Sequence, residues 1–140
     1  MPKMTRQEIE AFMAEPHVGH LTTLRPDGQP HVTPVWFLWK DNHVLVMTGA
    51  DSLKARHIAR NPAVALSIAA GQQPYRYVVV EGLASLTWDN LLDTVRDLCI
   101  RYNGPERGTA SAVELMADRD TVLIIDIAIK RVISRKFERM

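Results

Sequence analysis

The sequence has little cysteine, no long apolar run and almost no excess charge, and each shortage excludes a class of protein. Cys99 is the single cysteine, which excludes an intrachain disulfide framework and a metal site built from several cysteines. The longest apolar run, residues 122–129, is interrupted by Asp126 and falls well short of the ~18 residues of a membrane span. The 17 basic and 16 acidic residues give a net charge of +1, so no global basic field attracts nucleic acid.

These shortages set the expected location and partners of the chain. The first residues lack the apolar core of a signal peptide, and a lone cysteine suits a reducing compartment, so we expect a cytoplasmic protein. We expect neither a nucleic-acid partner nor a membrane. The 140 residues, 46% hydrophobic and 24% charged, have ordinary globular proportions and predict one domain over residues 1–140.

The order of the expected elements favours an antiparallel sheet. A capping-box spacing at Thr5 and Glu8 predicts a helix over residues 5–15. Further helices are expected at 52–61, 88–102 and 110–117, and strands at 18–24, 31–39, 43–48, 63–69, 77–86, 121–129 and 131–137. Because hairpin spacing dominates and crossover helices are few, we predict a mainly β (α+β) chain. An antiparallel barrel or strongly curved sheet with peripheral helices fits this order.

Three positions carry specific structural expectations. Pro34 lies inside a predicted strand, and its missing N–H restricts that strand to a sheet edge or a bulge. Gly82 interrupts another strand and predicts a bulge or a close approach. Cys99 falls on an apolar stripe that begins at Trp88 and ends at Tyr102, so we expect an inert core thiol.

The segment 48–57 is the most informative for chemistry. A strand runs into a small-residue turn and then into a helix that Ser52 can cap. The free N–H groups of a helix start favour an anion, whereas Lys54 and Arg56 oppose the helix dipole unless something negative binds there. A phosphate would resolve the conflict, and His57, one turn after Lys54, could join the site. The alternative is a solvated basic helix face beside a plain cap, and no P-loop spacing is present.

Two further segments could contact a ligand, and each has a purely structural alternative. In residues 31–37 the proline frees backbone groups that could face a planar heterocycle, or the segment is simply a sheet edge. Tyr75 and Arg76 suit a subunit interface or a stacked ring, or lie in an exposed loop. His17 and His20 would point to opposite faces of a strand, so we predict no metal site. No side chain stands out as a catalytic acid, base or nucleophile.

Several motifs together resemble a known superfamily over nearly the whole chain. They are G-H-L-T-T-L at 19–24, P-D-G-Q-P at 26–30, H-V-T-P-V-W-F at 31–37, S-L-K-A-R-H-I at 52–58 and P-Y-R-Y-V-V-V-E-G at 74–82. The chain is similar to the flavin-binding split β-barrel proteins of the pyridoxamine 5'-phosphate oxidase-like superfamily. Within it, the chain resembles the small oxidoreductases that depend on the deazaflavin coenzyme F420. True pyridoxamine-phosphate oxidases are longer, and their basic C-terminal residues have no match here in Arg131, Arg135, Lys136 and Arg139.

The resemblance implies an antiparallel split β-barrel that forms a homodimer, with two cofactor sites at the subunit interface. It implies that Lys54, with Ser52 and Arg56, holds the cofactor phosphate. It also implies that Tyr75 and Arg76 reach in from the partner subunit. The ring system would lie along one strand and the path to the phosphate along the next, which gives the remaining site residues Val32, Thr33, Pro34, Val35, Trp36, Met47, Thr48 and Gly49.

The function implied by the resemblance is a redox enzyme that uses coenzyme F420. A hydride would pass between the reduced cofactor and an electron-poor small molecule such as a conjugated ketone or a quinone. One alternative is FMN in the same site, in an oxidase or a flavin reductase. Others are a non-catalytic flavin- or heme-binding protein and a structural dimer with an empty pocket. The deazaflavin tail is bulkier than that of FMN and needs cations beyond Arg56.

Overall fold

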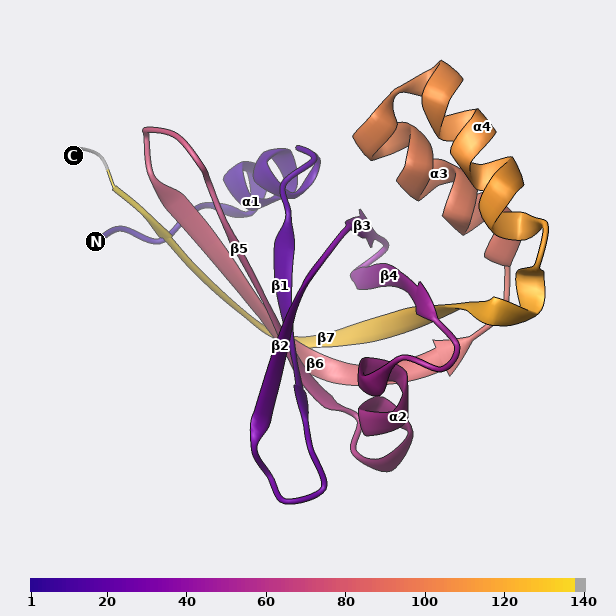
Figure 1. The fold of residues 1–140 in the computed structure, drawn as a ribbon. Helices are drawn as coiled ribbons and strands as arrows, with labels where there is room; N and C mark the ends of the chain where they lie inside the picture. The colour runs from indigo at the N-terminus through magenta and orange to yellow at the C-terminus, as the bar shows by residue number, and fades with distance from the viewer. Residues whose placement is uncertain (138–140) are drawn as a thin grey trace.

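A computed structural model describes residues 1–137. Arg139, one of the four basic residues compared above with those of the longer oxidases, lies outside this range. Seven strands form one sheet in which every neighbouring pair is antiparallel (Figure 1). The strands are β1 (Gly19–Leu24), β2 (Pro30–Val35), β3 (Phe37–Lys40), β4 (His43–Gly49), β5 (Ala63–Ala69), β6 (Arg76–Thr87) and β7 (Val122–Lys136). The helices are α1 (Arg6–Met13), α2 (Leu53–Arg60), α3 (Leu91–Asn103) and α4 (Pro105–Met116), with a short 3-10 turn at Arg119–Thr121.

The sheet curls so that its two edge strands follow one another in the chain. The strand order is β2-β1-β5-β6-β7-β4-β3, which places β2 at one edge and β3 at the other. Only Trp36 separates them, so the chain passes from one edge to the other within one residue (Figure 1). This arrangement confirms the predicted antiparallel split barrel and the predicted edge position of Pro34. The single strand predicted at 31–39 was wrong, because the chain leaves one ladder at Val35 and enters another at Phe37.

A bulge between β6 and β7 bends the longest strand pair. Glu81 pairs with Arg131 and Gly82 with Ile129, so Lys130 is the extra residue on β7. The bulge predicted at Gly82 is therefore confirmed. The two C-terminal strands predicted at 121–129 and 131–137 were wrong as separate elements. They form one strand, because a bulge inserts a residue and increases the twist without ending the ladder.

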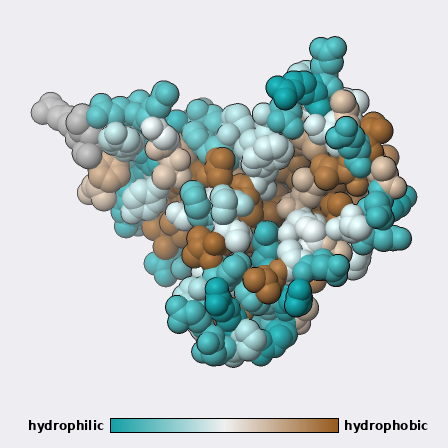
Figure 2. Space-filling model, in the orientation of Figure 1, coloured by the Kyte–Doolittle hydropathy of each residue, from teal (hydrophilic) through white to brown (hydrophobic). Residues whose placement is uncertain are grey.

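Two apolar clusters hold the elements together. The larger fills the curled sheet and includes Phe12 and Met13 from α1 together with Phe37 and Leu66. The smaller joins α3 and α4 to the outer side of β4 and β7, and Cys99 lies in it at 1% exposure. Burial raises the pKa of the Cys99 thiol, which confirms the predicted inert core thiol. In Figure 2, apolar side chains gather between the α3–α4 lobe and the strands, while polar side chains cover the ends of the molecule.

The long helix α3 begins three residues later than predicted. Asn90 takes a left-handed conformation with φ 53°, and the N–H of Leu91 donates to the carbonyl of Trp88, so the chain turns before the helix starts. Trp88 is 55% exposed and does not belong to the buried stripe. Pro105 then opens α4 directly after α3, and the two helices form a hairpin at the side of the sheet (Figure 1). Within residues 1–137, no helix has the length and apolarity that crossing a membrane requires.

Candidate functional site

A cavity lies where the two edge strands meet, and we call it the seam cavity. It has a volume of about 410 Å³, within the range of ~300–1,000 Å³ typical of small-molecule sites. Val18 borders it just before β1, Met47 from β4 and Lys54 from α2. The junction of β2 and β3 supplies the rest of the lining: Pro34, Val35 and Trp36. The structure therefore brings together five of the residues that the sequence comparison selected: Pro34, Val35, Trp36, Met47 and Lys54.

The start of α2 is built to present open N–H groups. Ser52 caps the helix, accepting a hydrogen bond of 3.2 Å from the N–H of Ala55, and Thr48 donates to the Ser52 hydroxyl at 3.0 Å. The Arg56 guanidinium donates to the carbonyl of Asp51 at 3.1 Å and so braces the turn. In the described chain, no group accepts a hydrogen bond from the N–H of Leu53 or Lys54. These groups and the helix dipole are suited to an anion.

Lys54 is the charged side chain of the seam cavity. It is half-buried and forms no ion pair with any residue among 1–137. Burial lowers the pKa of its ammonium group, because a charge that loses water without gaining a partner is destabilised. An anionic ligand would supply the missing partner. The geometry thus supports the phosphate role predicted for this residue without testing it.

Strand alternation divides the four residues on β2 that were selected from the sequence. Val32 and Pro34 are exposed on one face of β2, whereas Thr33 and Val35 point to the other face. One ring system cannot touch all four side chains from a single side. The Thr33 hydroxyl is buried and has no hydrogen-bond partner among residues 1–137, and Thr33 is not among the residues that line the seam cavity.

His57 does not join the anion site as a cation. It is 6% exposed, and its Nδ1 lies 2.8 Å from the Thr23 hydroxyl. Burial lowers the pKa of His57, and the nearby His31, Arg25, Arg60 and Arg56 lower it further. The ring is therefore neutral near pH 7 and serves as a packed partner of Thr23 and of the His31 ring, 5.2 Å away.

The same cluster forms an exposed positive surface next to the seam cavity. We define the α2 basic surface as Arg25, Lys54, Arg56 and Arg60. Within the part of the chain that the structure describes, no carboxylate forms an ion pair with any of the four. Arg60 is the last residue of α2 and Arg25 lies just after β1, and sequence reasoning missed both. Both lie near enough to His57 to lower its pKa.

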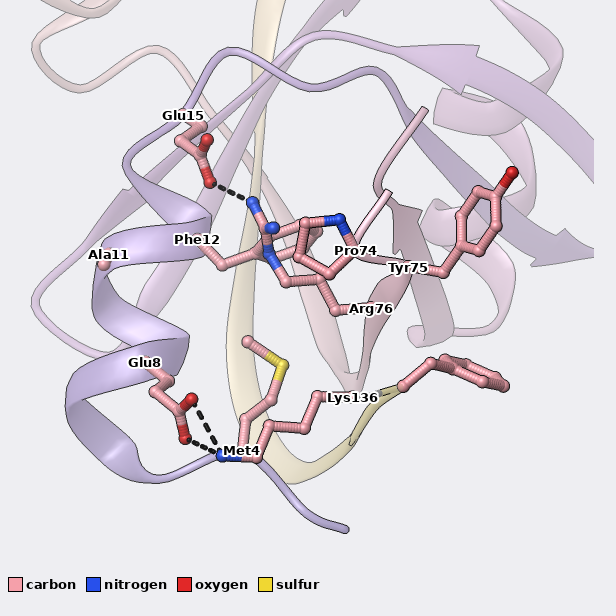
Figure 3. A pocket seen from close by; sticks show the side chains of 10 residues that line it. Met4, Glu8, Ala11, Phe12, Glu15, Pro74, Tyr75, Arg76 and Lys136 are labelled. Carbon is pink, nitrogen blue, oxygen red and sulfur yellow. Dashed lines mark hydrogen bonds and ion pairs between the residues drawn. The ribbon is translucent and has the colours of Figure 1, made fainter. Parts of the chain in front are cut away.

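Tyr75 and Arg76 lie away from the seam cavity. They border a second cavity of about 450 Å³ between α1, the start of β6 and the end of β7 (Figure 3). Arg76 donates to Glu15 at 2.9 Å, and its guanidinium lies 5.0 Å from the centre of the Phe12 ring. Tyr75 is 39% exposed. One chain alone does not bring these two residues to Lys54, so their predicted role stays a prediction about a partner subunit.

Two ion pairs at this second cavity fasten α1 to the sheet and make stability depend on pH. Hydrogen bonds from Thr5 and Lys136 lower the pKa of Glu8 below 4.5. Burial alone would raise the pKa of Glu15, but hydrogen bonds from Arg76 and His17 lower it below 4.5. A carboxylate with a lowered folded-state pKa contributes stability above its unfolded value and loses it as the pH falls through the folded value.

We therefore expect the free energy of unfolding to decrease as the pH falls from about 6 to about 3. Urea denaturation followed by circular dichroism measures this dependence. The double variant Glu8→Gln, Glu15→Gln should be less stable at pH 6 and should show a shallower decrease. An equally steep decrease in the double variant would show that other carboxylates control acid unfolding.

Metal binding has no support in the described residues. No group of three or more His, Cys, Asp or Glu side chains converges on one point within residues 1–137. His17 instead stacks on Phe12 with ring centres 4.5 Å apart, and His20 is exposed on β1.

Sequence reasoning also missed Val18 and Tyr102, both of which lie at the seam. Tyr102 fits an apolar helix stripe, and no feature of the sequence indicates that its hydroxyl reaches another element.

Comparison with known proteins gives a family match and close relatives. The family model described as Pyridoxamine 5'-phosphate oxidase matches residues 5–135. An F420H(2)-dependent biliverdin reductase of Mycobacterium tuberculosis is 38% identical over 94 residues, which is 66% of this chain and 65% of that protein. The aligned part thus falls just short of two thirds of that relative's length.

Two solved structures share the fold over almost the whole chain. A conserved hypothetical protein of Mycobacterium tuberculosis superposes with a TM-score of 0.83 at 27% identity, covering 98% of this chain and 91% of that one. A structure described as an F420 reductase superposes with a TM-score of 0.73 at 33% identity, covering 88% of this chain and 94% of that one.

Proposed function

The chain belongs to the pyridoxamine 5'-phosphate oxidase family, and we propose that it is an oxidoreductase that binds coenzyme F420 in the seam cavity. The observation that carries the proposal is Lys54, a half-buried cation without an ion-pair partner, beside the open N–H groups of α2. An open cavity of this size, with a cation that has no ion-pair partner among residues 1–137 and a helix start beside it, suits a planar ligand with an anionic tail. The relatives named for F420 support the same assignment.

The α2 basic surface favours the deazaflavin over FMN. FMN carries one phosphate, for which Lys54 and the start of α2 suffice. The deazaflavin has a longer acidic tail that continues past its phosphate. Arg60 at the end of α2 and Arg25 just after β1 add positive charge near His57, and neither has an acidic partner among residues 1–137. These two arginines supply the cations beyond Arg56 that the longer tail requires.

Each part of the site has a separate task in this proposal. Lys54 and the α2 N–H groups hold the phosphate. Pro34, Trp36 and Met47 give the ring an apolar wall that excludes water. When bound, the reduced cofactor supplies a hydride to an electron-poor acceptor. No described side chain is placed as an obligate proton donor, so we propose that the matching proton comes from solvent.

We also propose that the active form is a homodimer. The exposed face of β2 carries Val32, which is 56% exposed, and β5, which β1 separates from β2, offers the small residues Ala65 and Ala69 on its more open face. This open, partly apolar sheet face suits a second copy of the chain. In a dimer, Tyr75 and Arg76 of one subunit would be available to the seam cavity of the other.

Competitive retention tests the proposal directly. The purified protein is dialysed against equal concentrations of FMN and coenzyme F420, and the bound cofactor and the molar mass are measured together. We expect retention of F420 on a particle with the mass of a dimer. The loaded protein, with F420 in its reduced form, is then mixed with a quinone, a conjugated ketone and biliverdin.

Oxidation of F420 in step with reduction of one acceptor would support the reductase. Retention of FMN instead would move the protein to the oxidase or flavin-reductase alternative. Retention of F420 without turnover of any acceptor would favour a non-catalytic carrier, and retention of neither cofactor would overturn the site assignment. A monomeric mass would overturn the dimer.

A further inference from the structure

Tyr102, on the last turn of α3, closes the seam between the two sheet edges. Its hydroxyl accepts a hydrogen bond of 3.1 Å from the N–H of Phe37, the first residue of β3. The same hydroxyl donates to the carbonyl of His17, just before β1, at 2.7 Å. Tyr102 therefore links two segments: the residues that lead into β1, which lies next to the edge strand β2, and the first residue of the other edge strand, β3.

The Tyr102 ring also holds the side chain of Trp36. The two rings are parallel within 5°, and their centres are 4.6 Å apart. Trp36 borders the seam cavity and is 36% exposed. Because Tyr102 covers one face of the indole, the opposite face or the ring edge is left for the cavity.

Trp36 has no other evident restraint from the sheet. The ladder of β2 ends at Val35 and that of β3 begins at Phe37, so Trp36 pairs with neither β1 nor β4. Its orientation therefore depends on the ring against which it stacks. An aromatic stack of this kind fixes the plane of the indole as well as its position.

Tyr102 is itself held firmly by its neighbour Arg101. The Arg101 guanidinium donates to the carbonyls of Met13, Ala14 and Glu15, the last turn and exit of α1, at 2.8, 3.0 and 2.6 Å. It also lies 5.1 Å from the centre of the Phe37 ring. A cation that caps a helix C-terminus in this way fixes the end of α3 against the barrel.

We propose that Tyr102 is a positioning residue that holds Trp36 as a fixed wall of the seam cavity and thereby sets the affinity for the ligand. The identity of the ligand rests on the proposed function. The role of Tyr102 does not, since it is defined by its contacts with Trp36, Phe37 and His17. Through Tyr102, the position of the α3–α4 hairpin is coupled to the shape of the cavity.

Fluorescence quenching tests the hold on Trp36 without any cofactor. Trp39→Phe and Trp88→Phe leave Trp36 as the single tryptophan of the full-length protein, and acrylamide measures its accessibility. We expect Tyr102→Leu to increase the quenching constant of Trp36 about twofold, because one face of the indole becomes exposed. Tyr102→Phe keeps the stacked ring and should give a value between that of Tyr102→Leu and the single-tryptophan parent. Equal quenching in all three proteins would overturn the proposal.

Ligand binding gives the second measurement. We expect Tyr102→Leu to raise the Kd for coenzyme F420 about 2- to 12-fold, the worth of one aromatic pair. Trp36→Leu, at an exposed position that should tolerate the change, should raise the Kd by a similar factor. The double variant should be no worse than either single variant, because the two rings act as one unit. Additive losses would overturn the proposal.

The two measurements separate this inference from the proposed function. If the parent protein binds neither F420 nor FMN, the proposed function fails, and quenching still decides whether Tyr102 holds Trp36. If the parent binds F420 and Tyr102→Leu binds it equally well, the proposed function stands and the inference fails. Circular dichroism at the assay temperature confirms that each variant is folded before either comparison is made.

Discussion

Replacing Lys54 with alanine is expected to weaken the binding of coenzyme F420 by about 10- to 150-fold, the worth of one hydrogen bond to a charged group. The ammonium group is the charged side chain of the seam cavity and lacks an acidic partner among residues 1–137. Removing it leaves the ligand phosphate without its cation. The free energy of unfolding should change by only about 0.5 kcal/mol, because no native ion pair is lost.

Isothermal titration calorimetry measures the Kd, and urea denaturation measures the stability of the same protein. Lys40→Ala, at an exposed position on the edge strand β3, is the matched control and should bind with unchanged affinity. A Kd for Lys54→Ala equal to that of the parent would remove Lys54 from the phosphate site. A large loss of stability together with a small loss of affinity would give Lys54 a structural role instead.

The pH dependence of the same binding reaction tests the charge itself. Burial lowers the pKa of Lys54 below 10.5 in the free protein, and a bound anion would raise it again. The charged form binds, so affinity is present at neutral pH and is lost as the pH rises through the lowered pKa. Lys54→Arg keeps its charge in this range and should lose less affinity on the same rise. Parallel pH profiles for the two proteins would contradict the assignment.

The sequence predicted the fold from features that act locally. The capping box at Thr5 and Glu8 forms as expected, with both of its hydrogen bonds present. Pro34 indicated an edge strand because its missing N–H is a property of the residue alone. The short turns between strands predicted antiparallel pairing, and all six neighbouring pairs have it. The homodimer and the site residues remain predictions, because they concern a second chain and a ligand.

The features that sequence reasoning missed depend on how the sheet closes. Nothing in the pattern of residues 31–39 indicates that Trp36 leaves one ladder for another, since both halves look equally strand-like. Lys130 separates the two predicted C-terminal strands, because a bulge and a turn both interrupt alternation. Tyr102 fits an ordinary helix pattern, and only the folded arrangement of α3 against the two sheet edges brings it to Trp36.

The largest loss of stability is expected from Gly82→Ala. A Cβ atom at Gly82 would overlap the backbone carbonyl oxygen of Ala128 and would lie 3.0 Å from Cγ2 of Ile127. A backbone atom in a paired strand cannot move aside as a flexible side chain can. We therefore expect a cost near the upper end of overpacking effects, about 3 kcal/mol, and a decrease in Tm of roughly 10 °C.

Gly71→Ala is the matched control, because a Cβ there would meet no heavy atom within 4 Å. Its free energy of unfolding should lie within about 0.5 kcal/mol of that of the parent. Equal denaturation midpoints for Gly82→Ala and the parent would show that the strands separate at little cost.

The close approach at Gly82 matters for function because the bulge between Glu81 and Gly82 bends β6 and β7. This bend is one source of the curl that brings β2 and β3 together at Trp36. The folded fraction of the Gly82→Ala protein should therefore bind coenzyme F420 more weakly than the parent, although Gly82 does not line the seam cavity.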